Sequence, residues 1–493
     1  MKYSPVFLAI FSLQACSVGH GLTGERVEVE ANLPLVPQAY TVQPVSQTPE
    51  LANWLSQFDD SRMLTIVDEA LMASPTIIAS EATARAAREN ARALSGRSLP
   101  SVTYNFNNSY STTVRSTTIG EGIVVDGRFS QPDYSQSFQL NWELDLWGRV
   151  RANIDAAEAS YQASQADLAA ARLSIAGQAA TAWVNLNNAM EQERIARLTF
   201  DARKNTLDLT ERRFSRGLST ALDVRTARTQ LASAEAQIFN RLQSRNSAAR
   251  QLEVFLGRYP ANEIDAPSRL PVLTDIAMPG DPSLLLTRRP DIAASEARLE
   301  AAGLTAEAAR LAIFPSLRAS SSISNSSSIK FTDIFDPQRI SANILASLSQ
   351  SVWQGGALRA DRKAAVARAE VAAANYTNTV LTAWREVEDA LDADILLREQ
   401  EMAQERALEE AHKAEDLALR QYQRGLVSIF NLIQAQTTRL NSEANVIQIR
   451  ASRVVNRINY HLALGGGPLG QDQTTANTMA ALEIKETKES SAS

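Results

Sequence analysis

Few side chains in this 493-residue sequence have the types and spacing that catalysis or metal binding requires. The histidines are His20, His412 and His461, and the three lie far apart in the chain with no ligand spacing between them. Metal sites that recur in sequences place such ligands a few positions apart, so the pattern does not support zinc or thiol chemistry. We therefore expect no metal and no cofactor.

Two motifs match catalytic signatures only in part. Ser327 and Lys330 satisfy an S-x-x-K pattern, but they belong to a serine-rich stretch where chance produces it easily. Gly465 to Gly467 are followed by Pro468 and lack the lysine and hydroxyl residue of a phosphate loop. The end of a helix explains these glycines better, and the sequence predicts no catalytic residue and no enzyme.

The composition favours helices and carries little net charge. Lys plus Arg number 49 against 55 Asp plus Glu, and 44% of the residues are hydrophobic but only 6% aromatic. This balance does not favour nucleic acid as a partner. Abundant alanine with few aromatic residues is typical of long, closely packed helices.

The first residues are typical of an export signal. Lys2 precedes an apolar run from Val6 to Leu13, and Ala15 directly precedes Cys16, the only cysteine. A cysteine at this place is where bacterial lipoproteins are acylated, although Gln14 is an unusual neighbour. We predict a signal peptide over residues 1–15 and lipidation of Cys16; the alternative is an ordinary cysteine with no lipid.

The chain contains two copies of one plan. SLPSV at 98–102 corresponds to IFPSL at 313–317, which lies 215 positions later. Further on, the offset is 208 for GRVRA at 148–152 with GALRA at 356–360, and for RGLSTALDV at 216–224 with RGLVSIFNL at 424–432. The first copy therefore carries seven extra residues after Pro100.

In each copy this variable segment has the period of a β-hairpin. Apolar and polar residues alternate strictly from Ser137 to Leu146 and again from Val102 to Asn107, with a glycine-rich turn around 120–127 between them. The second copy repeats the pattern more weakly, with Phe331 to Gln338 as its loop. Four strands cannot close a membrane barrel, which needs about eight, so we expect three copies to supply twelve.

The segments that flank the hairpins are too long for helices of a globular domain. Residues 149–216 contain no proline and one glycine, and residues 357–424 contain neither. As continuous helices each would measure about 100 Å. Shorter helices are expected over 219–256 and 427–464. A seam of residues seven apart, beginning with Ile154 and Tyr161, predicts coiled-coil packing.

The turns RGLST at 216–220 and RGLVS at 424–428 join long helices to short ones. Gly217 and Gly425 suit a left-handed helix end, and the following Ser or Thr suits the start of the next helix. We call these turns the first tip and the second tip. In a ring of helical hairpins the tips would meet and narrow the bore.

These residues together resemble the TolC-like outer membrane factor family, and specifically its NodT-type efflux lipoprotein branch. The matching motifs are WELDLWGRVRA at 142–152, RRPDI at 288–292, the two RGL tips and LALGGG at 462–467. The resemblance covers residues 54–467 in order. It implies a mainly α fold with a β-barrel part: a homotrimer with a twelve-stranded transmembrane β-barrel and a long periplasmic α-helical barrel.

The same resemblance implies the function and the partners. Such proteins are passive outer-membrane channels of tripartite efflux systems, lipid-anchored, with most of the chain in the periplasm. They dock onto a periplasmic adaptor, or membrane fusion protein, and an inner-membrane pump, here expected to be a proton-driven pump of the resistance-nodulation-division type. The cargo would be small molecules such as drugs, toxic compounds or metals.

The resemblance also implies site residues near the tips. It places the periplasmic aperture at Phe430, Asn431 and Gln434, where relatives often carry aspartates at the last two positions. Amides here predict weaker block by cations and leave Phe430 as a hydrophobic constriction. Asp223 and Tyr422 match residues of a latch between protomers. An alternative interpretation is that Asp223 is only an exposed carboxylate at the start of a helix, where the helix dipole favours a negative charge.

Two other functions remain open at this point. One is an outlet duct for type I protein secretion, and the other is a periplasmic coiled-coil scaffold that never enters the membrane. The expected division of the chain is a signal peptide at 1–15, an anchored equatorial segment at 16–60, repeat 1 at 61–256 with its hairpin at about 101–146, an equatorial linker at 257–285, repeat 2 at 286–467 with its hairpin at about 316–352, and a disordered tail at 468–493.

Overall fold

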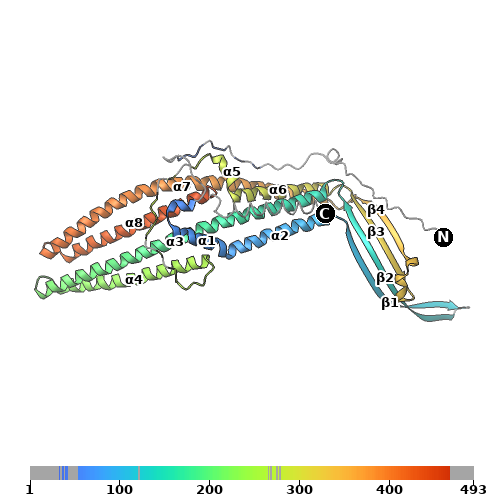
Figure 1. Cartoon of the computed structure of the whole chain (residues 1–493), viewed down its shortest axis with the longest axis horizontal. Helices are drawn as coiled ribbons and strands as arrows, with labels where there is room; N and C mark the ends of the chain where they lie inside the picture. Colours follow the sequence, from blue (N-terminus) through green and yellow to red (C-terminus); the bar gives the residue numbers. More distant parts are fainter. Residues whose placement is uncertain are drawn as a thin grey trace, which may run out of the picture. The chain divides into compact units, whose positions relative to one another are not determined.

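The computed structural model describes residues 54–119, 123–264 and 279–466, together with residues 31, 33, 36, 37, 39–42, 266, 269–273 and 276. The predicted signal peptide, Cys16 and the predicted tail lie outside the described residues. The described elements are mainly helical, with one antiparallel sheet (Figure 1).

Both copies of the repeat place two strands between a short and a long helix. The first copy contains η2 (Trp54–Phe58), α1 (Ser61–Ala73), α2 (Pro75–Arg97), β1 (Ser101–Ile119), β2 (Ile123–Leu144), α3 (Arg149–Ser215) and α4 (Ala221–Phe255). The second contains η3 (Pro282–Leu284), α5 (Leu285–Arg288), α6 (Pro290–Leu311), β3 (Ser316–Ser327), η4 (Phe331–Phe335), η5 (Pro337–Arg339), β4 (Ser341–Ser349), α7 (Ala357–Arg424) and α8 (Ile429–Ala463). The predicted long helices are therefore confirmed to within a residue at each end.

The chain divides into two compact units. The described residues of unit 1 lie within Arg85–Gln162 and Glu296–Ala374, together with Ala31, and they include the sheet. Those of unit 2 lie within Asn32–Ala84, Ala163–Ser295 and residues 375–466, and they include the two helical tips. Among the described residues no single helix is long and apolar enough to cross a membrane, while α1 and α2, bent by 44°, meet that criterion only as a pair.

In unit 1 the four strands form an antiparallel sheet in the order β1-β2-β3-β4. Tyr104 pairs with Phe138, which pairs with Ile323, so these three side chains share one face of the sheet. Because alternate residues point to opposite faces, this apolar face also carries Val102, Leu140, Trp142, Ala319, Ile344, Ala346 and Leu348.

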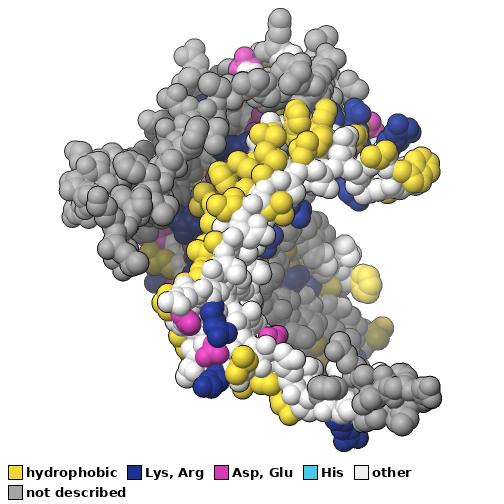
Figure 2. Space-filling model, turned by 90° about the vertical axis from the view of Figure 1, so that its right-hand side faces the viewer, with side chains coloured by type: hydrophobic (Ala, Val, Ile, Leu, Met, Phe, Trp, Pro, Cys, Tyr) yellow, Lys and Arg dark blue, Asp and Glu magenta, His cyan; other side chains and the backbone are white. Residues whose placement is uncertain are grey.

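The opposite face of the sheet is polar. It carries hydroxyl and amide side chains from all four strands: Thr103, Asn105, Ser137, Gln139, Ser320, Ser322, Ser324 and Asn343. The large apolar side chains of the other face are exposed in the single chain, Ile344 to 85%. In Figure 2, which views the side where the strands lie in Figure 1, hydrophobic side chains gather in a strip beside polar ones. A sheet with one apolar and one polar face is thus confirmed.

The strands of the first hairpin are longer than those of the second. β1 and β2 have 19 and 22 residues, whereas β3 and β4 have 12 and 9, because the second copy spends residues on η4 and η5. Gly127, expected in the turn, instead pairs with Arg115 inside the first hairpin. Leu146 was expected in the strand but lies beyond its end at Leu144.

Helix α3 is packed through small side chains. Ala152 and Ala159 near its start are buried, as are Ala156 and Ala163, and the members of each pair are seven residues apart. The expected seven-residue period is present: at the predicted seam positions, Ile175 is buried, whereas Ile154 and Tyr161 are half-buried beside the buried alanines. The small residues allow a neighbouring helix to approach closely.

In unit 2 the core lies around the middle of α3 and the end of α8. Trp183, Val184, Leu186, Val454 and Ile458 are buried there with the start of the described chain at Trp54. Asp60 begins α1 by accepting hydrogen bonds from the amides of Arg62 and Met63, and it also accepts one from the indole of Trp183 at 2.8 Å. The cap therefore joins α1 to the long helix.

Candidate functional site

The second tip presents the predicted aperture residues on one side of α8. Phe430 is 70% exposed, and Asn431 and Gln434 are exposed beside it, one and four positions later on the same helical face. The opposite side of the helix is anchored by Ile429 and Leu432, which are buried in a cluster with Tyr422. The exposed ring of Phe430 and the two amide side chains therefore project from a helix whose other side is packed into the protein.

Both tips turn at glycines with left-handed backbone. Gly217 has φ 72° and Gly425 has φ 78°, as predicted. The first tip is capped by Thr220, whose side chain accepts a hydrogen bond from the amide of Asp223. Ser428 occupies the corresponding N-cap position of α8, but its side chain makes no capping bond, so the predicted second cap is wrong.

Asp223 completes the cap of the first tip. Its Oδ2 accepts hydrogen bonds from the amide of Thr220 at 2.9 Å and from the hydroxyl of Ser219 at 2.8 Å. The bond from the Thr220 amide is the main cause that lowers the pKa of Asp223. Within one protomer the carboxylate therefore acts as a helix start, and its latch role between protomers stays a prediction.

Tyr422 has a partner that the sequence did not reveal. The ring is buried, and its hydroxyl lies 2.9 Å from the hydroxyl of Thr210 on α3. The hydroxyl that the predicted latch would use is therefore already hydrogen-bonded within the protomer.

Arg213 joins the two tips. Its Nη1 donates to the main-chain oxygens of Tyr422 at 2.7 Å and Gln423 at 3.1 Å, and its Nη2 donates to the oxygen of Leu218 at 3.1 Å. The guanidinium also lies 4.8 Å from the ring centroid of Tyr422. It thereby satisfies carbonyls at the end of α7, which a helix leaves without partners. The sequence analysis did not predict this role of Arg213. The feature that could have indicated it is an arginine one helical turn before the glycine of the first tip.

A polar seam continues from the tips along α3 and α8. Arg203, which is buried, donates to the side chains of Gln436 and Thr437, both at 2.7 Å. Burial lowers the pKa of Arg203. Further along, Asn188 bonds to Gln448 at 2.9 Å. The two helical hairpins of the protomer are thus joined through hydrogen bonds, whereas apolar contacts dominate in the core described above.

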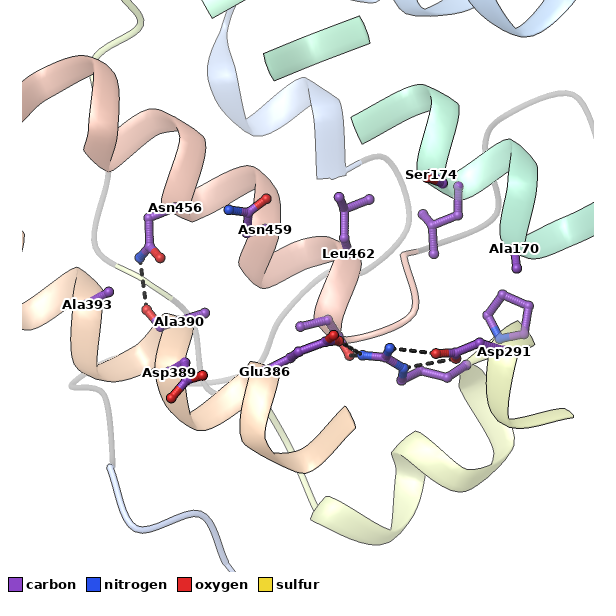
Figure 3. Close-up of a pocket in the computed structure, with 14 residues that line it drawn as sticks. Ala170, Ser174, Asp291, Glu386, Asp389, Ala390, Ala393, Asn456, Asn459 and Leu462 are labelled. Carbon is purple, nitrogen blue, oxygen red and sulfur yellow. Dashed lines mark hydrogen bonds and ion pairs between the residues drawn. The ribbon is translucent and has the colours of Figure 1, made fainter. Parts of the chain in front are cut away.

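A cavity of about 670 Å³ in unit 2 lies beside the RRPDI motif. Arg289 forms ion pairs there with Asp291 at 2.7 Å and Glu386 at 2.8 Å, and it donates to the oxygen of Ala463 at 2.9 Å. In Figure 3 Asp291 and Glu386 converge on this one guanidinium. Burial alone would lower the pKa of Arg289, but the two carboxylates raise it. The motif therefore clamps the start of α6 to α7 and the end of α8.

The histidines do not form a site among the described residues. His412 is exposed on α7, and His461 is buried on α8 between aromatic rings. Its ring is stacked on Trp54 with centroids 5.7 Å apart and meets Phe58 edge-on at 6.3 Å. Burial, assisted by the charge of Arg457, lowers the pKa of His461 to about 3. In the described part of the chain no group of three or more His, Cys, Asp or Glu residues could hold a metal ion.

The S-x-x-K pair is part of a turn. The hydroxyl of Ser327 donates to Asp333 at 3.0 Å and accepts from the main-chain amides of Ile329 and Lys330. The serine thus ends β3 and begins the connection to η4. This arrangement accounts for the motif without a nucleophile.

The repeated helical hairpins, each with a tip, and the four-stranded sheet with one apolar face give the chain the fold of outer-membrane efflux channels, as in the solved structures that it resembles. The chain belongs to the outer membrane efflux protein family, which it matches over residues 66–258 and 282–466.

Three relatives illustrate the likeness. The outer membrane protein OprJ of Pseudomonas aeruginosa is 32% identical over 69% of this chain and 72% of its own length. The pyoverdine export outer membrane protein OpmQ of the same species is 29% identical over 86% of this chain and 89% of its own. A solved structure of CusC, a cation efflux system protein in Escherichia coli, has a TM-score of 0.77 at 25% identity and covers 90% of this chain and 99% of that one.

Proposed function

We propose that three copies of this chain assemble into a passive duct through the outer membrane. The observation that carries the proposal is the sheet: four strands with one exposed apolar face and one polar face, ending in the edge strands β1 and β4. In lipid every main-chain polar group needs a partner, so open edges must be paired. Pairing β4 of one copy with β1 of the next closes twelve strands, with the apolar face toward lipid.

In this assembly the helical tips of unit 2 form the periplasmic aperture. Phe430 forms the hydrophobic constriction, and Asn431 and Gln434 line it with neutral amides. A ring without carboxylates has no strong attraction for divalent cations, which prefer charged oxygen ligands. We therefore expect weak block of the pore by Mg²⁺ or Ca²⁺.

Conductance in planar bilayers tests the duct and the aperture together. Purified wild-type trimers should show small closed-state conductance, and Phe430→Ala should increase it several-fold because the constriction widens. The matched control is Leu222→Ala, which shortens an equally exposed apolar side chain on the first tip. If Phe430→Ala behaves like Leu222→Ala, the constriction is assigned to the wrong residue; if wild-type trimers never conduct, there is no duct.

The partners follow from the same architecture. A periplasmic adaptor would bind the grooves between the tips, near residues 212–228 and 420–436, and an inner-membrane pump of the resistance-nodulation-division type would supply the cargo. The names of OpmQ and CusC refer to pyoverdine export and cation efflux, and small molecules of this kind are the class of cargo that we propose. Site-specific photo-crosslinking from Leu426, exposed on the second tip, should capture the adaptor.

The outer-membrane location includes a lipid anchor at Cys16 in our proposal, after removal of residues 1–15. The division into repeat 1 at 61–256, a linker at 257–285 and repeat 2 at 286–467 is supported by the matching order of elements in both copies. The two rival functions make different predictions: a scaffold would be released from membranes by salt alone, and a secretion duct would be required for export of a protein and not for resistance to small toxic molecules.

A further inference from the structure

The apolar face of the sheet is interrupted by a polar row near one end. Gln136 pairs with Asn325 across β2 and β3, and Ser327 follows two positions later on the same face. Toward the other end this face carries Phe138, Ile323 and other apolar residues. An amide without a partner that faced hydrocarbon would be unfavourable, because no hydrogen bond from solvent replaces the lost one.

The segment 328–340, which contains η4 and η5, covers this row. The Gln136 Nε2 donates to the main-chain oxygen of Ile334 at 2.7 Å, and the Asn325 Nδ2 donates to that of Asp336 at 2.8 Å. Ile334 is completely buried between the segment and the strands. The donors of the polar row are thus satisfied by the backbone of the segment, which must lie against the same face as the apolar side chains.

Aromatic contacts hold the segment in this place. The ring of Phe331 meets Phe106 edge-on at 6.0 Å and Tyr134 at 5.6 Å, and both partners belong to the apolar face. Phe335 in turn meets Phe331 edge-on at 5.7 Å. Edge-on aromatic pairs stabilise a contact beyond the area that they bury, so the segment is a packed part of the sheet.

The side of the segment that faces away from the sheet is itself apolar. Ile329, Phe335 and Ile340 are all more than half exposed, and Phe335 is exposed to 62%. A patch of this kind on a surface bathed in water would be unfavourable and marks an interaction site. Its charged residues are partly neutralised, since Arg339 lies 3.6 Å from Asp333 and 3.7 Å from Asp336. Lys330 is exposed at the start of η4.

We infer that residues 328–340 are an outward-facing lipid contact, which inserts Phe335 and its apolar neighbours into the outer leaflet at the level of the headgroups. The inference rests on the proposed barrel, because the apolar face is continuous with the patch. The polar row then marks where hydrocarbon ends, and the amphipathic segment covers the boundary. Aromatic side chains are favoured at this depth, and the ammonium of Lys330 can reach a lipid phosphate.

Spin labels on the full-length trimer in phospholipid vesicles test the inference. The variants are Phe335→Cys on the segment, Ile344→Cys on the apolar face, and Asn343→Cys, the adjacent residue on the polar face. Each new thiol carries a nitroxide, and all three sites are exposed. Phe335→Cys removes the edge contact with Phe331, but Phe331 keeps its contacts with Phe106 and Tyr134. Wild-type protein treated with the same reagent gives the background from Cys16, and trimer assembly is checked for each variant.

Electron paramagnetic resonance then compares collisions of each label with oxygen, which concentrates in lipid, and with a water-soluble nickel complex. The ratio of oxygen to nickel collisions should be several-fold higher at position 335 than at position 343, and higher still at position 344. A label at 335 as accessible to nickel as that at 343, with 344 in hydrocarbon, overturns the lipid contact and leaves the barrel standing. If 344 is also in water, both the barrel and the lipid contact fail.

Discussion

Acidification should loosen the junction between η2 and the end of α8, because that junction buries a neutral histidine. His461 is 2% exposed and lies between the rings of Trp54, Phe58 and Tyr460. The nearest charge that affects its titration is Arg457, which is paired with Asp394 at 3.1 Å. Neither a solvent shell nor a carboxylate next to the ring can stabilise an imidazolium there.

The sign of the effect follows from proton binding. With a folded pKa of about 3 and an ordinary value of 6.5, His461 stays neutral in the folded junction while the opened junction binds a proton. Between these values the open state binds more protons, so stability falls as the pH falls. Each pH unit below 6.5 costs about 1.4 kcal/mol, which amounts to about 2 kcal/mol at pH 5, or roughly a 30-fold increase in opening.

Hydrogen exchange of a peptide covering residues 54–64 measures this opening. Exchange rates are divided by the intrinsic rate at each pH, and the slope of protection against pH is compared between wild type and His461→Gln. The wild-type slope should approach one decade per pH unit below pH 6.5, whereas the glutamine variant, which has no titrating group, should show no such slope. A difference in absolute stability between the two proteins does not affect the comparison, because only the slopes are compared. Equal slopes in both proteins would refute the assignment to His461.

Three further perturbations probe other parts of the molecule. Arg213→Gln should lower the free energy of unfolding by about 2 kcal/mol, because the hydrogen bonds to the carbonyls of Tyr422 and Gln423 are lost, and it should raise the closed-state conductance. Arg212→Gln, which changes an exposed neighbour, should change neither quantity. Gly257→Ala should lower the melting temperature and reduce the free energy of unfolding by about 1–3 kcal/mol, since Gly257 has φ 65° and the added methyl carbon would lie 2.9 Å from the main-chain oxygen of Ala73. Gly303→Ala, with open space around it in α6, should instead stabilise by about 0.5–1 kcal/mol; equal melting temperatures for the two variants would contradict the packing argument. Cys16→Ser should abolish incorporation of a labelled fatty acid, and a wild-type chain that incorporates none is not a lipoprotein.

Much of the fold could be predicted because local pattern and tertiary environment agree. Strict alternation around Phe138 predicted a strand with one apolar face, and the absence of proline over 357–424 predicted α7 correctly. Two left-handed glycines could be located from the RGL motifs. In these places each residue's own preference points to the conformation that the fold requires.

The sequence-based predictions fail or are incomplete where contacts between residues far apart in the chain determine the structure. The seven-residue row that begins at Ile154 and Tyr161 did not identify the buried alanines such as Ala156, because the burial of a small side chain depends on which neighbouring helix packs on it. The hydrogen bond from Arg213 to the main-chain oxygen of Tyr422 joins residues about two hundred positions apart, and no local sequence period predicts such a bond. Residues 331–338 were predicted only as a loop, because the hydrogen bonds of this segment to Gln136 and Asn325 depend on the register of β2 with β3.

The polar face of the sheet also determines how a cargo would be treated on its way out. In the proposed trimer it becomes an inner wall composed mostly of serine, threonine, asparagine and glutamine, with one exposed carboxylate at Asp133. Glu143 and Arg318 lie opposite each other 3.9 Å apart and offset one another's charge. Such a wall offers weak, interchangeable hydrogen bonds and no deep electrostatic well for either sign of charge. Cationic, anionic and neutral molecules would all diffuse through without being retained, so discrimination between substrates must be completed before they reach this exit.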